Sequence, residues 1–511
     1  MRPVLRRASF IVSIALITAP FVSAQTDPLA GFDAYITKAV ADWKVPGLAI
    51  AVVKDDRLVF AHGYGVRERG KPEAVDTDTL FAIGSTTKAM TAALVGMLVD
   101  EKKVAWDAPV TNYLPWFQLK DPAVTRELTV RDLLTHRAGL GNADYLWYGQ
   151  HNSTDEILRR VRLIDPAYPV RSSFIYQNIM YAAAGAVIEA ASGTPWSEMI
   201  RTRIFEPLGM RRTIATAATL SRESNVASPH DIIEHEVRVI ENVSVDPVAA
   251  AGAVWSSVGD MSKWMQFVLD GGRVGPAGTR LLSEDTFAEL FRPQTIAPYD
   301  MYPTSRLTRP HWMTYGLGWF QQDYHGRAVD FHTGSIDGMV AIHGLIRDEH
   351  LGVYVLANRD HAELRHALMY SVFDRYGQPQ SDRDWSADFL ELYGGIQKEA
   401  DKEQAAKDGR RVTGTTPSVP LERLAGDYAD PLRGDVRVTI DAGRLHLQYG
   451  SAFVGTLAHW HYNTFRAAWN AAWRAPELVN FALDNDGQPT AVEIFGARFV
   501  RKPAAATKPA A

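Results

Sequence analysis

The order of strand-like and helix-like segments along the chain limits its fold more than any other feature. Apolar runs at residues 48–53 and 58–63 flank a polar turn and predict a hairpin. Residues 339–346 and 351–356 flank a second polar turn in the same way. Between these pairs, residues 105–290 show helical periods broken by proline and glycine. Strands that bracket a helical insertion predict an α/β sandwich with an all-helical lobe, and an active site is expected in the cleft between the lobes.

The last part of the chain has a different pattern and predicts a second domain. Residues 395–420 begin with a highly charged stretch and continue with threonine, serine and proline, which is typical of a linker. Alternating apolar and polar residues then predict short strands, and about 80 residues of these predict a small all-β barrel. The expected organisation is a first domain at 25–394, the linker at 395–420, the barrel at 421–502 and a disordered tail at 503–511.

The N-terminus resembles a secretory signal. Three arginines precede an apolar run at residues 8–22, which is too short to span a bilayer and contains a proline. The small residues Val22, Ser23 and Ala24 provide a cleavage site, so residues 1–24 are predicted to be a signal peptide. The alternative is an uncleaved anchor. After cleavage, no transmembrane segment is expected, and the protein is predicted to be secreted or, in a bacterium, periplasmic.

Two features of the composition exclude whole classes of function. The 511 residues include no cysteine, which excludes disulfides, thiolate nucleophiles, iron–sulfur clusters and cysteine-ligated zinc. Lysine and arginine total 54 against 59 acidic residues, a net charge of −5, so nucleic acid is not an expected partner. Because cysteine is absent, any nucleophile must be an oxygen or a nitrogen.

Ser85 and Lys88, in the sequence GSTTK, are the candidates for an activated nucleophile and its partner. A helix is expected to follow Ser85, because apolar residues recur at helical spacing over residues 90–98. The serine would lie at the positive end of the helix dipole, and the lysine three residues later would return to the same face. A buried lysine favours its neutral form and can accept a proton from the serine. This motif is weak by itself, since Ser can also simply cap a helix.

Two later motifs strengthen this interpretation. Tyr176 and Asn178 form a Tyr-x-Asn motif just before a predicted helix, where the asparagine could alternatively act as a helix cap. The run His332-Thr333-Gly334 precedes the second strand pair, where an edge strand could offer backbone groups to a substrate. The backbone N–H of the following residue, Ser335, could join that of Ser85 in an oxyanion hole.

The ordered set of Ser-x-x-Lys, Tyr-x-Asn and His-Thr-Gly resembles the serine β-lactamase and penicillin-binding-protein superfamily. The resemblance covers about residues 30–375 and is closest to the branch of class C β-lactamases, D,D-carboxypeptidases, D-aminopeptidases and esterases. It implies an α/β domain with an antiparallel sheet flanked by helices. Residues 421–500 are similar to the lipocalin-like domain attached to some of these hydrolases. Further similar segments are Leu133-Leu134-Thr135-His136, Ala138-Gly139-Leu140, Ala250-Ala251-Gly252, Trp255-Ser256-Ser257, Gly426-Asp427-Tyr428 and His459-Trp460-His461-Tyr462.

The resemblance also implies roles for these residues. Ser85 would attack a carbonyl group and form an acyl-enzyme, with Lys88 and Tyr176 sharing the acid and base work. Asn178 would bind the substrate amide, and the N–H groups of Ser85 and Ser335 would hold the oxyanion. How the lysine and the tyrosine divide the proton transfers stays open.

The third motif differs from the β-lactamase pattern, which usually has a lysine where this chain has His332. With Thr333 and Gly334, His332 is still expected to bind substrate, although a structural role for the histidine is the alternative. A mostly neutral histidine suits a substrate carboxylate less well than a lysine does. The expected substrates are therefore small molecules or peptides with amide or ester bonds, D-amino-acid peptides first, with weak or no β-lactam hydrolysis.

Other interpretations remain at this point. The same fold could be a non-catalytic binding protein for peptidoglycan fragments or a protein partner. The barrel could serve homo-oligomerisation. No P-loop or dinucleotide motif occurs, and no third ligand accompanies His459 and His461, so neither a cofactor nor a metal ion is expected.

Overall fold

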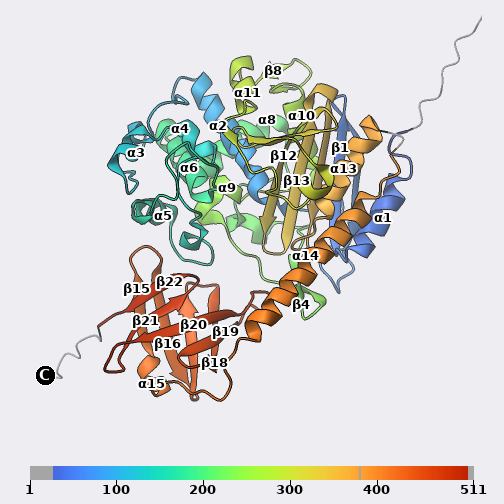
Figure 1. Cartoon of the computed structure of the whole chain (residues 1–511). Coiled ribbons are helices and arrows are strands. Elements are labelled where there is room, and N and C mark those ends of the chain that lie inside the picture. Colours follow the sequence, from blue (N-terminus) through green and yellow to red (C-terminus); the bar gives the residue numbers. More distant parts are fainter. Residues whose placement is uncertain (1–26, 379–380, 504–511) are drawn as a thin grey trace, which may run out of the picture.

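The structure, a computed structural model, describes residues 27–378 and 381–503 of the chain (Figure 1). The predicted signal peptide, residues 1–24, and all but the first residue of the predicted tail at 503–511 lie outside this description. Among the described residues, no helix combines the length and the apolar character needed to cross a membrane.

An antiparallel sheet of eight strands forms the centre of the first unit. The hairpins expected at 48–63 and 339–356 are both confirmed, and they lie next to each other in the sheet because the first strand pairs with the last. In spatial order the strands are β2 (Arg57–Gly65), β1 (Gly47–Lys54), β14 (Leu351–Ala357), β13 (Met339–Ile346), β12 (Arg327–Ile336), β11 (Phe320–Tyr324), β10 (Met313–Tyr315) and β9 (Thr295–Ile296).

Both faces of this sheet are covered, which explains why β1 and β14 are apolar along nearly their whole length. On β1, the side chains of Leu48, Ile50 and Val52 join the core beneath α1 (Phe32–Asp42) and α13 (Leu364–Gly377). The alternate residues of β1 join the other core, against α10 (Val258–Leu269) and the helical lobe. A strand buried on both faces loses the polar alternation of a half-exposed strand.

The helical lobe is built around α2 (Thr87–Asp100), the helix expected after Ser85. Every residue of this helix from Thr87 to Leu98 is buried, not one face alone, because other helices surround it. Its largest neighbour is α6 (Asn178–Ser192). The remaining helices of this region are α3 (Pro122–Glu127), α4 (Val130–Leu134), α5 (Thr154–Arg160), α7 (Trp196–Ile200), α8 (Glu206–Leu208), α9 (Ala249–Gly252) and α11 (Glu284–Leu290). A further short helix, α12 (Ser305–Thr308), packs through Leu307 against the core on the other face of the sheet.

Three short strand pairs lie outside the main sheet. They are β3 (Phe81–Ala82) with β6 (Trp255–Ser256), β4 (His230–Ile233) with β5 (Glu236–Val239), and β7 (Arg273–Val274) with β8 (Thr279–Arg280). The first of these pairs leads directly into the turn that carries Ser85.

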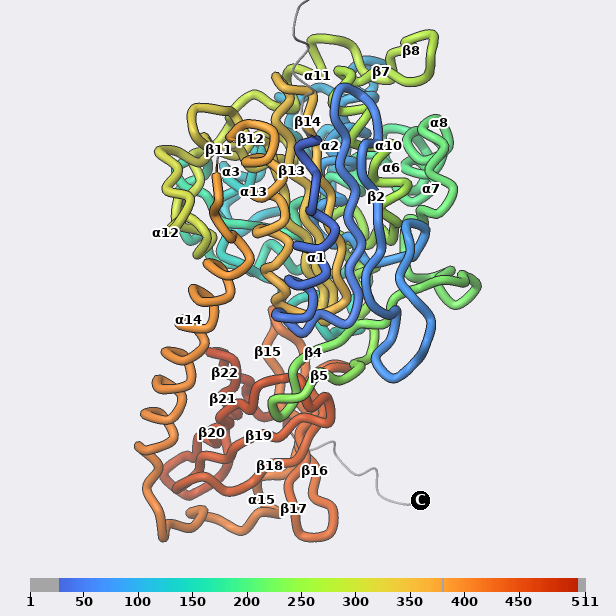
Figure 2. Tube along the Cα trace, turned by 90° about the vertical axis from the view of Figure 1, so that its right-hand side faces the viewer, coloured from blue at the N-terminus to red at the C-terminus, as the bar shows by residue number. Residues whose placement is uncertain are grey.

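The connection between the two units differs from the expected linker at 395–420. The first part of that segment is helical, because α14 (Trp385–Asp408) continues through it for 24 residues. Only three residues of α14, all in its first two turns, are buried, so its charged composition fits a solvated helix as well as a linker. Figure 2 shows α14 leaving the first unit and running to the second.

The second unit is a closed barrel of eight antiparallel strands, as the sequence predicts. Apolar side chains that alternate along the strands fill its interior, including Val436, Leu447 and Phe481. A short helix, α15 (Leu421–Leu424), precedes the strands β15 (Gly426–Asp430), β16 (Gly434–Asp441), β17 (Arg444–Tyr449), β18 (Phe453–His461), β19 (Thr464–Trp469), β20 (Glu477–Leu483), β21 (Pro489–Ile494) and β22 (Ala497–Arg501).

Candidate active site

Ser85 lies in a 3₁₀ turn, η1 (Gly84–Thr86), which runs directly into α2. Lys88 is in the first turn of that helix, and its Nζ atom donates a hydrogen bond of 2.8 Å to Ser85 Oγ. The same ammonium donates to Asn178 Oδ1 at 2.8 Å and to the carbonyl oxygen of Ala251 at 2.9 Å. The structure therefore brings the serine and lysine of the first motif together with the asparagine of the second.

The electrostatic environment of Lys88 is unusual for a lysine. Its side chain is completely buried, and none of its three hydrogen-bond acceptors carries a charge. Burial penalises the ammonium and holds the pKa of Lys88 well below its ordinary value, while the more distant carboxylate of Asp144 acts in the opposite direction. A lysine in this position gives up its proton more readily than an exposed lysine does.

Tyr176 lies over this cluster and is only partly buried. The Lys88 ammonium is 4.8 Å from the centroid of its ring, and on another side the ring packs against His136 at 4.3 Å between centroids. Burial raises the pKa of Tyr176 well above its ordinary value, and a hydrogen bond with the Ser85 side chain lowers it in part. Tyr176 and Lys88 thus both adjoin Ser85, and burial shifts their pKa values in opposite directions, that of Lys88 downward and that of Tyr176 upward.

Asn178 is the first residue of α6, but its side chain does not cap the helix. Its carbonyl oxygen accepts from Lys88, and its amide nitrogen donates to the carboxylate of Asp144 at 3.1 Å. Trp147 Nε1 also donates to Asp144, at 2.7 Å. Asp144 therefore fixes the orientation of the Asn178 amide and is a site residue that no local motif had indicated.

The third motif is on β12, whose backbone comes very close to Ser85. Pairing with β11 ends at Phe331, so the following residues of β12 pair with β13 alone and present a free edge. An added Cβ at Gly84 would lie 2.7 Å from the backbone nitrogen of Ser335, and one at Gly334 would overlap the carbonyl oxygen of Ile83. Two glycines are therefore required where the strand passes the turn.

The side chain of His332 is buried and makes its polar contacts within the protein. Its side chain is 1% exposed, Nε2 lies 3.0 Å from the Tyr315 hydroxyl, and Nδ1 lies 2.6 Å from the carbonyl oxygen of Thr333. The hydroxyl of Thr333 is 2.9 Å from that of Tyr302. The His332 side chain is thus buried and bound to groups of the protein itself, while Ser335 is exposed, and a contact between His332 and substrate stays a prediction.

A buried ion pair that the sequence analysis missed supports this strand from behind. Arg365 on α13 is 5% exposed and donates to the carbonyl oxygen of Gly334 at 2.5 Å and to Ser335 Oγ at 3.0 Å. Its charge is matched by Glu363, at 3.1 Å, which is also hydrogen-bonded to His366. No local pattern links these residues to a site, because only the fold brings α13 behind β12.

His136 was noted only as part of a similar segment, but it adjoins the site. Its Nδ1 atom accepts a hydrogen bond of 3.0 Å from the backbone nitrogen of Gln177. Burial, together with the charge of Lys88, holds the pKa of His136 well below its ordinary value, so the ring is neutral. A neutral ring against Tyr176 adds no further charge next to Lys88.

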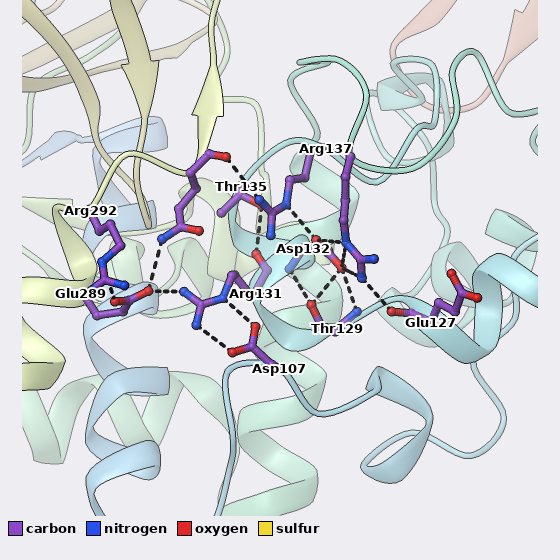
Figure 3. A network of polar contacts seen from close by, with 11 residues as sticks. Asp107, Glu127, Thr129, Arg131, Asp132, Thr135, Arg137, Glu289 and Arg292 are labelled. Carbon is purple, nitrogen blue, oxygen red and sulfur yellow. Dashed lines mark hydrogen bonds and ion pairs between the residues drawn. The ribbon is translucent and has the colours of Figure 1, made fainter.

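The segment that carries His136 is anchored by the network of charged residues drawn in Figure 3. Asp132 is completely buried and accepts from Arg137 Nε at 2.7 Å and from Arg171 Nη2 at 2.7 Å. Arg137 also donates to the carbonyl oxygen of Gln294 at 3.1 Å, next to the outermost strand β9 of the sheet. The network therefore joins the helical lobe to the sheet at the far end of the site.

The structure shows no metal centre in the part of the chain that it describes. Within residues 27–378 and 381–503, no group of three or more histidine, aspartate or glutamate side chains is placed to hold an ion. His459 Nε2 lies 3.0 Å from the carbonyl oxygen of Tyr462, and His461 Nδ1 accepts from the backbone nitrogen of Val412 at 3.2 Å.

Comparison with protein families matches residues 32–374 to the family described as Beta-lactamase. The chain belongs to this family. Residues 410–507 match a domain of unknown function. Members of the beta-lactamase superfamily are serine hydrolases, and the relatives of this chain include proteins named hydrolase and penicillin-binding protein.

Two relatives illustrate the similarity. "Unguisins hydrolase ungD" of Aspergillus violaceofuscus is 30% identical over 91% of this chain and 88% of its own length. "Penicillin-binding protein 4" of Amycolatopsis lactamdurans is 31% identical over 58% of this chain and 76% of its own.

Among solved structures, the octameric penicillin-binding protein homologue from Pyrococcus abyssi matches 92% of this chain and 99% of its own, with a TM-score of 0.60 and 21% identity. A structure titled "Crystal structure of SurE" covers 93% and 99%, with a TM-score of 0.55 and 22% identity. These likenesses concern the fold, and both extend over the sheet unit and the barrel.

Proposed function

We propose that this protein cleaves amide or ester bonds through an acyl-enzyme formed on Ser85. The observation that carries the proposal is the hydrogen bond from the buried Lys88 ammonium to Ser85 Oγ, made without any carboxylate in contact with the lysine. A serine next to a lysine of lowered pKa is an activated nucleophile. The family of the chain, whose members are serine hydrolases, agrees with this chemistry.

The first chemical step is the attack of Ser85 Oγ on the substrate carbonyl carbon. The hydroxyl proton passes to the Lys88 and Tyr176 pair, and the carbonyl electrons move to the oxygen. The backbone N–H groups of Ser85 and Ser335 hold this oxyanion, because the two nitrogens flank the place where Gly84 and β12 meet. As the carbonyl re-forms, the leaving group departs with the proton that Ser85 gave up.

The second step reverses the first with water as the nucleophile. The same pair takes a proton from water, which attacks the acyl carbon, and Ser85 Oγ leaves as the hydroxyl. Lys88 and Tyr176 share these proton transfers, because the side chains of both residues adjoin Ser85. Asn178 keeps Lys88 in place and presents its amide to the substrate.

The preferred substrates are D-amino-acid peptides, followed by small esters, with weak or no β-lactam hydrolysis. His332 stands where β-lactamases usually have a lysine. Its ring is buried, and the two ring nitrogens lie within hydrogen-bonding distance of the Tyr315 hydroxyl and the Thr333 carbonyl oxygen. β12 therefore carries no lysine at this position that could bind a carboxylate of the substrate. The relative named as a hydrolase of unguisins supports hydrolysis as the activity.

The test of this function is the intact mass of the protein after exposure to a fluorophosphonate and, separately, to a fluorescent penicillin. Ser85→Ala is the decisive variant, and Ser153→Ala, which removes only the cap of α5, is the matched control. We expect a fluorophosphonate adduct that persists in the control and disappears in Ser85→Ala. No adduct from either probe would instead favour a non-catalytic binding protein.

Export and assembly are further proposals. The sequence of residues 1–24 supports secretion, and N-terminal sequencing of the protein recovered outside the cytoplasm should begin near residue 25. Assembly through the barrel is supported by the likeness to an octameric homologue. Light scattering of the full chain would show a single-chain mass if that proposal is wrong.

A further inference from the structure

A loop of the barrel reaches the first unit beside the candidate active site. This loop, residues 470–476, joins β19 to β20. From it, Arg474 Nη1 donates to the Tyr148 hydroxyl at 2.8 Å, and Nη2 lies 3.3 Å from Asp337 Oδ2. Trp473 Nε1 donates to the same carboxylate oxygen at 3.2 Å. Tyr148 itself donates to Asp337 at 2.6 Å. We call these four residues the clamp.

The clamp joins the two walls of the cleft. Asp337 lies in the turn between β12 and β13, two residues after Ser335. Tyr148 follows the short segment of the helical lobe in which Asp144 orients Asn178. A single arginine of the barrel therefore binds the sheet wall, next to one proposed oxyanion donor, and the helical wall, next to the amide that contacts Lys88.

The clamp residues are largely buried and make several contacts with one another. The side chains of Arg474 and Asp337 are only 7% and 15% exposed, so the ion pair is largely removed from water. The Arg474 guanidinium also packs at 4.8 Å from the ring centroids of both Tyr148 and Phe453. Arg474 is thus desolvated and is bound by a carboxylate, a phenol and two aromatic rings. We expect such an arginine to keep its position, unlike an exposed surface arginine.

Behind the clamp is a cavity of about 580 Å³ between the barrel and the first unit. Its lining includes Trp473 and Arg474 on the barrel side and residues 149–151 on the other. Trp473 and Arg474 line this cavity and also contact Asp337, which is two residues from Ser335, so they lie between the cavity and this proposed oxyanion donor.

We propose that Arg474 and Trp473 close one end of the substrate cleft and thereby limit the length of the substrate on that side. These are specificity-determining residues contributed by the barrel. The inference rests on the proposed function of Ser85. Loss of the clamp would connect the cleft to the cavity, which has room for the distal part of a long substrate.

The test uses the full-length chain and two fluorophosphonates that differ only in their alkyl group, ethyl or dodecyl. The measured quantity is the ratio of the two rates of Ser85 modification. We expect Arg474→Ala to raise the dodecyl rate relative to the ethyl rate about tenfold. The matched control is Arg466→Ala, because Arg466 forms a more exposed ion pair with Asp408 of α14 and does not contact the clamp. Its ratio should equal that of the unaltered chain.

A ratio that stays within twofold in Arg474→Ala overturns the inference, whether or not both rates fall together. If that variant does not fold, Tyr148→Phe removes the hydroxyl that Arg474 and Asp337 share and should raise the ratio in the same direction. Failure of both probes to label the unaltered chain would instead overturn the proposed function and the inference with it. Labelling with an unchanged ratio overturns the inference alone.

Discussion

Lys88 and Asp132 are both completely buried in the helical lobe, yet they are surrounded in opposite ways. Asp132 is bound by two arginines and by the capping box of α4. Lys88 is bound only by neutral oxygen atoms. For both residues burial opposes the charged form, but hydrogen bonds from Arg171, Thr129 and Arg137 nevertheless hold the pKa of Asp132 below its ordinary value. Nothing comparable supports the charge of Lys88, so its pKa falls.

The difference separates a structural charge from a chemical one. A buried carboxylate with two arginines stays ionised over the physiological range and ties segments together. A buried amine without a counter-ion in contact can change its protonation state during a reaction. The same degree of burial therefore gives an anchor in one region and a proton acceptor in the other.

The largest effect is expected from Lys88→Met. It removes the proton acceptor at Ser85, so kcat/KM, or the rate of fluorophosphonate labelling, should fall by roughly 10⁴-fold. Lys263→Met is the matched control, because Lys263 also lies in a helix but is partly exposed and paired with Asp260. An active Lys88→Met enzyme would contradict the role of the lysine.

The next effect concerns stability rather than activity. Asp132→Ala leaves Arg137 and Arg171 without their shared carboxylate and should lower the free energy of unfolding by about 3–5 kcal/mol. Asp107→Ala is the control from the same network, since Asp107 is 73% exposed and its loss should cost about 1 kcal/mol or less. Urea unfolding followed by tryptophan fluorescence measures both. Equal losses would mean that burial does not distinguish the two carboxylates.

The pH dependence of activity should shift in Asp144→Asn. The neutral form of Lys88 is the proton acceptor, so kcat/KM rises as the pH increases through the pKa of Lys88. The Asp144 carboxylate raises that pKa, and its removal should move the acid limb to lower pH. Asn142→Ala removes a neutral contact to Asp144 and should leave the limb in place. A shift to higher pH would be the wrong sign.

The smallest effect is expected from Arg171→Ala. The Arg171 side chain is 40% exposed. When it is removed, Arg137 still balances the charge of the Asp132 carboxylate. The free energy of unfolding should therefore fall by about 1 kcal/mol or less in the same urea assay. A loss as large as that of Asp132→Ala would show that the two arginines cannot replace each other.

Much of this architecture follows from local patterns in the sequence. The two hairpins, the helix after Ser85 and the barrel were predicted because apolar spacing reports which faces are buried. The contact between Ser85 and Lys88 follows from their spacing of three residues on one helix start. The spacing of apolar residues thus predicts the secondary structure of a segment wherever that spacing is regular.

The rest depends on contacts that no local pattern contains. Asp144 and Arg365 reach the site only because the fold brings distant segments together. The contact between His332 and Tyr315 was not predicted, because a strand pattern does not tell which polar partner a histidine finds. The C-terminal part of α14 lies within the predicted linker, and its helical form was not predicted, because a helix that buries few side chains has the composition of a solvated segment.

The length of α14 has a mechanical consequence. At the rise of an α-helix its 24 residues extend for about 36 Å, so a tilt of about 5° at its base near Trp385 would move the far end by about 3 Å. That displacement is as large as the hydrogen bonds of Arg474. The far end of the helix is joined to the barrel by the ion pair of Asp408 with Arg466. The contacts of the barrel with the first unit, including those of Arg474, therefore limit how far α14 can tilt.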